Sequence, residues 1–170
     1  LPGRLAVTPP LEFATPDLAD GAPQARALLL PWLDFGARPR FCGPAVTVKC
    51  FEDNSQVKAL VNEPGEGRVL VVDGGQSLRR ALLGDLLAAA AASNGWAGLV
   101  IAGAVRDVEQ LRETAVGIKA LGACPLRTDR RGEGQRDIVV TIGGTRVAPG
   151  EWIYADGSGV LVSATDLLAS

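Results

Sequence analysis

Residues 84–107 read GDLLAAAAASNGWAGLVIAGAVRD, and this stretch decides the fold. Asp85 stands before an alanine-rich segment that the Asn94-Gly95 pair ends, a pattern that predicts a short helix. The apolar run that follows predicts a strand over residues 98–102, and a glycine turn then leads to Arg106 and Asp107. We expect the helix and the strand to fold back on each other, so that the start of the helix lies beside the end of the strand.

The flanking sequence alternates between extended and helical patterns and then turns entirely to strands. Strands are predicted over 45–51, 68–73 and 117–123. Helices are predicted over 24–30, 54–62 and 108–113, and a further helix opens at 74–77 and runs to 83. Residues 35–44 are predicted to form a Gly/Pro-rich connector. From Asp137 on, short strands over 138–142, 145–148, 152–155 and 160–162 are separated by pairs such as Gly143-Gly144 that predict hairpin turns. The sequence therefore predicts an α/β fold, layered around a mixed sheet, with C-terminal antiparallel hairpins.

The length of 170 residues fits one domain with a proper core. Residues 1–24 hold several prolines, and we expect them to form a flexible N-terminal arm with one short helix near 16–19. Residues 25–170 are expected to form the single folded domain.

Composition excludes several classes of partner. The net charge of −2 gives no general attraction to nucleic acid, and the pairs Arg79-Arg80 and Arg130-Arg131 are interpreted as solvated surface. No apolar run reaches the roughly 20 residues that span a bilayer, and no signal-peptide layout is present. The three cysteines are far apart and form no Cys-x-x-Cys motif, which favours free thiols in a cytoplasmic protein.

The absence of histidine restricts the chemistry most strongly. Within one chain it excludes Ser-His-Asp and Cys-His catalysis and every imidazole metal ligand. Acid–base work must then use carboxylates, Lys, Tyr, Arg or metal-bound water. A metal site would be lined by oxygen, which favours magnesium, manganese or calcium.

Two candidate sites receive little support from the sequence. Residues 72–77, VDGGQS, follow a buried strand as a cofactor loop would, but the full Gly-x-Gly-x-x-Gly fingerprint is missing. A Schiff-base aldolase needs a lysine desolvated in a pocket, and none of Lys49, Lys58 and Lys119 has an acid at a suggestive spacing.

The stretch 84–107 carries a stronger candidate site. Backbone N–H groups of Gly84, Asp85, Leu86 and Leu87 at a helix start can bind a carboxylate. Arg106 can donate a forked pair of hydrogen bonds to a carboxylate or a ketone oxygen, and Asp107 can ligate a hard cation. Taken singly, Asp85 is better explained as a helix cap, and Arg106 with Asp107 as a surface ion pair. Together, these groups supply what a 2-oxo acid needs.

The chain resembles a known family at these residues. Asp85, twenty intervening residues and then Arg106-Asp107 are similar to the signature of the 4-hydroxy-4-methyl-2-oxoglutarate aldolases, whose wider group includes RraA, the regulator of ribonuclease activity A. The similarity runs from about 35 to 162 and includes residues 47–54 (TVKCFEDN), 67–75 (GRVLVVDGG), 103–107 (GAVRD), 117–121 (GIKAL) and 154–157 (YADG).

The resemblance implies a β/β/α swivelling-domain-like fold, a homotrimer or hexamer, and a site near a subunit boundary. It implies that the protein cleaves 4-hydroxy-4-methyl-2-oxoglutarate to pyruvate and decarboxylates oxaloacetate, with magnesium or manganese. Asp107 would ligate the metal, Arg106 would contact the pyruvyl group and its enolate, and Asp85 would organise the waters that move protons. The amides of residues 84–87 would hold the substrate carboxylate. An acid from a neighbouring subunit is also implied.

The same resemblance leaves other functions open. An RraA-type protein binds ribonuclease E and lowers its activity without catalysis, and residues 47–75 are similar to that branch. The presence of Asp85, Arg106 and Asp107 favours the enzyme. A menaquinone-pathway methyltransferase has little support, because the cofactor loop is weak.

Overall fold

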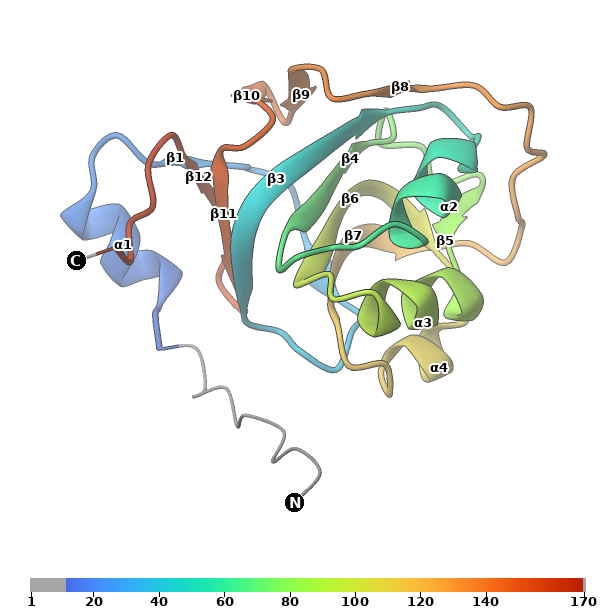
Figure 1. Ribbon diagram of the computed structural model, residues 1–170, viewed down its shortest axis with the longest axis horizontal. Helices are drawn as coiled ribbons and strands as arrows, with labels where there is room; N and C mark the ends of the chain where they lie inside the picture. The colour runs from blue at the N-terminus through green and yellow to red at the C-terminus, as the bar shows by residue number, and fades with distance from the viewer. Residues whose placement is uncertain (1–11, 170) are drawn as a thin grey trace.

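One curled sheet of ten strands runs through residues 12–169, the part of the chain that the computed structural model describes (Figure 1). Its centre is parallel and is formed by β3 (Phe41–Lys49), β4 (Val69–Asp73), β6 (Gly98–Val105) and β7 (Gly117–Ala123). Antiparallel strands continue it beyond β3 with β11 (Trp152–Asp156), β12 (Gly159–Ser163) and β1 (Arg26–Ala27), and beyond β7 with β2 (Leu33–Asp34). Two short strands, β5 (Ala81–Leu83) and β8 (Gln135–Arg136), pair with β6 and β3. A separate hairpin joins β9 (Val140–Ile142) to β10 (Thr145–Val147).

Of the four helices within residues 12–169, three cover one face of the parallel strands, while the β-rich layer lies on the other (Figure 1). These three are α2 (Ser55–Val61), α3 (Asp85–Ser93) and α4 (Val108–Leu111), and α1 (Thr15–Gly21) packs against β11 and β12. One hydrophobic core lies between the helices and the parallel strands, and a second lies between those strands and the hairpins. The protein is therefore a β/β/α sandwich, as the sequence predicts.

Local sequence explains the central elements. The apolar residues of β6 are all buried, which is the usual state of a parallel strand that is covered on both faces. The small side chains of Ala88 and Ala91 are fully buried, which lets α3 pack directly on the sheet. After α3, Gly95 adopts φ +80°, a left-handed conformation that glycine accepts without strain and that ends the helix.

Three predicted segments are wrong. Residues 24–30 form no helix, because Arg26 and Ala27 pair with β12, and this pairing overrides their helical composition. Residues 74–83 form a turn and then β5, because Gly75 and Gln76 adopt φ +65° and +59° and cannot open a helix. The predicted connector 35–44 contains the first half of β3, which pairs with β11.

The other predicted strands and helices are present, with ends shifted by a few residues. Residues 1–11 of the predicted N-terminal arm lie outside the described residues. Within the described part, the backbone N–H and the hydroxyl of Thr15 donate hydrogen bonds to the Asp156 carboxylate, at 2.7 and 2.6 Å. Among residues 12–169, no helix is both long enough and apolar enough to cross a bilayer.

Candidate active site

The pairing of β5 with β6 creates the site. Leu83 and Val105 are register partners at the ends of these two parallel strands, and the Arg106 N–H donates to the Leu83 carbonyl at 2.9 Å. The residues that directly follow each strand are therefore neighbours. On one side these are Gly84 and the start of α3, and on the other Arg106 and Asp107.

Four of the predicted site residues make contact here. The backbone N–H of Asp85 donates to Oδ2 of Asp107 at 2.9 Å, so the carboxylate at residue 107 caps α3. A Cβ built on Gly84 would lie 2.7 Å from that oxygen and 3.4 Å from Arg106 Cγ. The absence of a side chain at residue 84 thus leaves the space in which the two later residues sit.

Asp85 is exposed, whereas Asp107 has an uncommon backbone conformation. The Asp85 carboxylate accepts the N–H of Leu86 at 2.8 Å, and Leu86 itself is 79% exposed beside it. Asp107 adopts φ +56°, a left-handed conformation that is uncommon for a residue with a side chain. Backbone strain of this kind gathers at functional sites.

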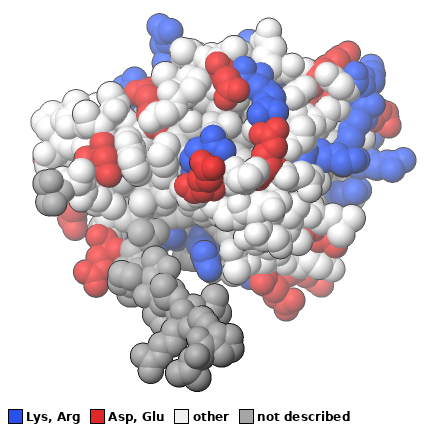
Figure 2. Space-filling view, in the orientation of Figure 1, with Lys and Arg blue, Asp and Glu red and all other residues white. Residues whose placement is uncertain are grey.

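A cavity of about 580 Å³ opens over these residues. One wall is the start of α3 with Arg106 and Asp107, and the facing wall is formed by α2 and the segment 127–130 between β7 and β8. Four cationic and three acidic side chains line it: Lys58, Arg106, Arg127 and Arg130, with Asp85, Asp107 and Asp129. Figure 2 shows basic side chains gathered at the right-hand edge of the molecule, where Figure 1 places the segment between β7 and β8. The cavity suits a small anionic molecule.

The far wall depends on residues that sequence reasoning did not select. Asn54 is buried, and its side-chain oxygen accepts hydrogen bonds from Thr128 Oγ1 at 2.7 Å and from Arg130 Nε at 2.9 Å. Its amide donates to the Leu82 carbonyl at 3.1 Å. Arg130, which the sequence assigned to solvated surface, is exposed but held in place at the cavity. A lone Asn in a loop carries no sequence signal for this role, because its partners are 74 and 76 residues away.

Asp53, next to Asn54, holds the same segment through its backbone. One carboxylate oxygen accepts hydrogen bonds from the N–H and hydroxyl of Ser55, and the other from the N–H groups of Arg131 and Glu133. Burial alone would raise the pKa of Asp53, but the hydrogen bonds from Ser55, Arg131 and Glu133 outweigh it and lower that pKa to about 2. The carboxylate is therefore ionised throughout the neutral range.

The two weaker candidates from the sequence remain weak in the structure. The Gly74-Gly75 turn leads into β5 and offers no helix N-terminus to a phosphate. Lys119 is buried, but its ammonium bonds the Asp156 carbonyl and pairs with Asp34 at 2.9 Å. Lys58 lines the cavity and Lys49 is exposed. All three cysteines are free thiols, and Cys50 and Cys124 are buried.

Comparison with known proteins gives one family. The family model described as RraA-like, Aldolase/RraA, matches residues 15–162. A Pseudomonas putida protein named "Putative 4-hydroxy-4-methyl-2-oxoglutarate aldolase" is 56% identical over 156 residues, which cover 91% of this chain and 96% of the relative. A Burkholderia multivorans protein of the same name is 54% identical and covers 92% and 99%.

Two solved structures match across nearly the whole chain. The RNA-processing inhibitor RraA from Thermus thermophilis superposes with a TM-score of 0.88 at 45% identity, covering 91% of this chain and 94% of that one. A Geobacillus kaustophilus structure, titled S-adenosylmethionine: 2-dimethylmenaquinone methyltransferase, gives a TM-score of 0.91 at 42% identity, covering 93% and 99%.

Proposed function

Because this chain belongs to the RraA-like (Aldolase/RraA) family, we propose that it is a lyase that cleaves 4-hydroxy-4-methyl-2-oxoglutarate, or a related 4-hydroxy-2-oxo acid, to pyruvate. We further propose that it depends on a divalent metal, magnesium or manganese, and that it decarboxylates oxaloacetate. The observation that carries the proposal is the contact between the start of α3 and the Arg106-Asp107 pair inside one cavity.

The two ends of the cavity suit a 2-oxo acid with a second carboxylate. The amides of residues 84–87 begin a helix. Because those of Asp85 and Leu86 already donate to the carboxylates of Asp107 and Asp85, the amides of Gly84 and Leu87 would bind the carboxylate next to the ketone. Arg106 would donate to the ketone oxygen. The guanidinium of Arg130, with Lys58 and Arg127 nearby, would bind the carboxylate at the far end of the substrate.

Cleavage breaks the bond between carbons 3 and 4 of the substrate. The proton of the 4-hydroxyl leaves to a water that Asp85 orients, the oxygen becomes the ketone of one pyruvate, and the bonding electrons form the enolate of the other. A proton then returns to carbon 3 and completes the second pyruvate. Arg106 donates hydrogen bonds where the negative charge of the enolate develops, and this is the type of interaction that accelerates such a step.

The residues present fit magnesium or manganese whose ligands come largely from water and substrate. Among the described residues, no group of three or more His, Cys, Asp or Glu side chains could hold a metal ion. Asp107 still offers a carboxylate at the cavity, and magnesium is commonly bound through one or two carboxylates with several waters. When bound, the metal would act as a Lewis acid toward the oxygens of the 2-oxo acid.

Pyruvate release tests the proposal directly. Purified protein is incubated with oxaloacetate or 4-hydroxy-4-methyl-2-oxoglutarate and magnesium, and pyruvate is measured through a coupled dehydrogenase. We expect turnover well above the rate with magnesium alone. A rate equal to that background with both substrates would overturn the proposal.

A glycine substitution tests whether the contact at Gly84 matters. Gly84 has φ −131°, which alanine also adopts, so Gly84→Ala acts only through its Cβ against Asp107 and Arg106. We expect about a 100-fold loss of turnover, since displacements near 1 Å can cost that much, with a thermal unfolding transition that stays cooperative. The matched control is Gly21→Ala, whose Cβ would meet no atom of the described residues within 4 Å. Equal activity of the two variants would contradict the assigned site.

Inhibition of ribonuclease E is a second candidate function, favoured by the 45% identity to the Thermus RraA protein. Such a role needs an outer surface rather than the cavity, so it would persist in the Gly84→Ala variant. A ribonuclease assay with and without the protein measures it.

The resemblance also implies a homotrimer or hexamer, and exposed apolar side chains such as Leu29 and Leu33 are compatible with contacts between copies. Light scattering would measure that assembly.

A further inference from the structure

The carboxylate of Asp53 lies outside the cavity, yet it is 0% exposed and fully hydrogen-bonded. Its four donors come from two segments that are far apart in the sequence. Oδ1 accepts the N–H and hydroxyl of Ser55 in the first turn of α2, at 2.9 and 2.5 Å. Oδ2 accepts the N–H groups of Arg131 and Glu133 at 2.8 and 3.2 Å. One buried charge thus joins α2 to the segment after β7.

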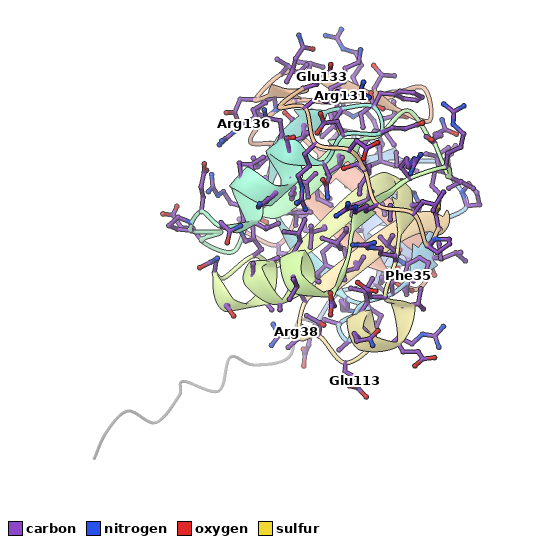
Figure 3. All side chains as sticks on the ribbon, turned by 90° about the vertical axis from the view of Figure 1, so that its right-hand side faces the viewer. Phe35, Arg38, Glu113, Arg131, Glu133 and Arg136 are labelled. Carbon is purple, nitrogen blue, oxygen red and sulfur yellow. The ribbon has the colours of Figure 1, made fainter. Side chains whose placement is uncertain are left out.

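Ser55 extends the same connection. Its hydroxyl oxygen accepts the N–H of Gly132 at 3.0 Å, so three successive backbone N–H groups, at 131, 132 and 133, are held by Asp53 and Ser55. In Figure 3, Arg131 and Glu133 lie close together at one end of the face that is turned toward the viewer, and Arg38 and Glu113 lie at the other end. Side chains of residues 127–133 are mostly exposed, so this segment is fixed mainly through its backbone.

The fixed segment carries the cavity wall that faces Arg106. Thr128 and Arg130 both line the cavity and both bond the side chain of Asn54. An exposed arginine has many rotamers, and binding an anion with it is costly unless its backbone and side chain are already in place. Asp53 supplies the backbone part of that placement, because it holds the residue directly after Arg130.

We propose that Asp53 is a positioning residue that fixes segment 127–133 against α2, so that Arg130 binds the second carboxylate of the substrate. This inference rests on the proposed function, since it assigns the end of the 2-oxo acid that Arg106 does not bind. Asp53 itself does not touch the substrate. Its effect on the reaction is exerted through Arg130.

Proteolysis tests the structural half without any assay of activity. Trypsin cleaves after arginine, and cleavage at Arg130 or Arg131 requires this segment to leave the Asp53 carboxylate. We expect Asp53→Ala and the milder Asp53→Asn and Ser55→Ala to be cut there first and much faster than the wild type, as mass spectrometry of the fragments would show. The matched control is Glu63→Gln, which breaks the nearby ion pair with Arg136 and leaves the Asp53 contacts intact. Equal cleavage of all variants would overturn the proposal.

Kinetics test the functional half. With 4-hydroxy-4-methyl-2-oxoglutarate, whose second carboxylate is retained in a product, we expect Asp53→Asn and Arg130→Ala to raise KM by about tenfold or more, as loss of a charge-assisted hydrogen bond predicts, while kcat changes little. Inhibition by pyruvate, which has no second carboxylate, should remain unchanged in both variants. The double variant should be no worse than Arg130→Ala alone, because both changes remove the same interaction.

The outcomes separate the two claims. A purely structural role for Asp53 would give additive effects in the double variant and would weaken pyruvate inhibition as well, and either result overturns the proposal. If Asp53→Ala does not fold, Asp53→Asn and Ser55→Ala decide the matter. A wild-type protein without turnover would overturn the proposed function and the role of Arg130 in binding, while proteolysis would still decide whether Asp53 holds the segment.

Discussion

Arg106→Ala is expected to lower pyruvate release by about 100- to 1,000-fold, the usual cost of removing a donor from a developing oxyanion. Arg106 lies at the cavity beside Gly84, while the other cationic residues that line the cavity in the described part of the chain, Lys58, Arg127 and Arg130, are on the facing wall. Since the enolate charge appears only as the carbon–carbon bond breaks, the loss should fall on kcat more than on KM.

Two further variants make this result specific. Arg106→Lys keeps the positive charge but loses the planar fork, so it should restore only part of the activity. Arg112→Ala removes an exposed arginine from the end of α4, outside the cavity, and should leave turnover unchanged. Steady-state rates with oxaloacetate and magnesium compare the three variants with the wild-type protein. An Arg106→Ala protein as active as the Arg112→Ala control would exclude Arg106 from the reaction.

Removal of the divalent metal is expected to abolish turnover down to the rate without protein, and Asp107→Asn is expected to reproduce most of that loss. Asparagine tolerates the left-handed φ of +56° and can still accept the N–H of Asp85. The substitution therefore keeps the cap of α3 and removes only the negative charge that a hard cation requires.

The measurement is pyruvate release after chelation and again after magnesium is added back. Wild-type activity should return, whereas Asp107→Asn should need much more magnesium or fail to recover. Isothermal titration of magnesium into both proteins gives a readout that is independent of activity. Glu113→Gln, at the exposed end of α4 (Figure 3), is the matched control and should behave as wild type. Full activity in the presence of chelator would contradict the metal-dependent reaction.

Patterns within single segments were sufficient for most of the architecture. The apolar run of β6, the alanine-rich α3 with its Asn94-Gly95 end, and the glycine-punctuated C-terminal strands are all present where their periodicity predicts them. The failures, at 24–30, 35–44 and 74–83, are strands formed by pairing with distant partners. A helical composition such as that of 24–30 loses to such pairing, and no local pattern reveals it.

The candidate site, like the fold, was determined partly by the sequence and partly by the tertiary structure. The sequence by itself determined that Asp85, Arg106 and Asp107 are present and that each follows or begins an element, because turns and helix starts are encoded locally. Only the tertiary structure decided that these residues meet, because a strand of three residues, β5, pairs with β6 and places the start of α3 beside Arg106 and Asp107. The tertiary structure also decided the cavity wall that faces Arg106. Asp53 and Asn54 acquire their importance from hydrogen bonds to residues more than 70 positions away, and sequence spacing carries no information about contacts of that range.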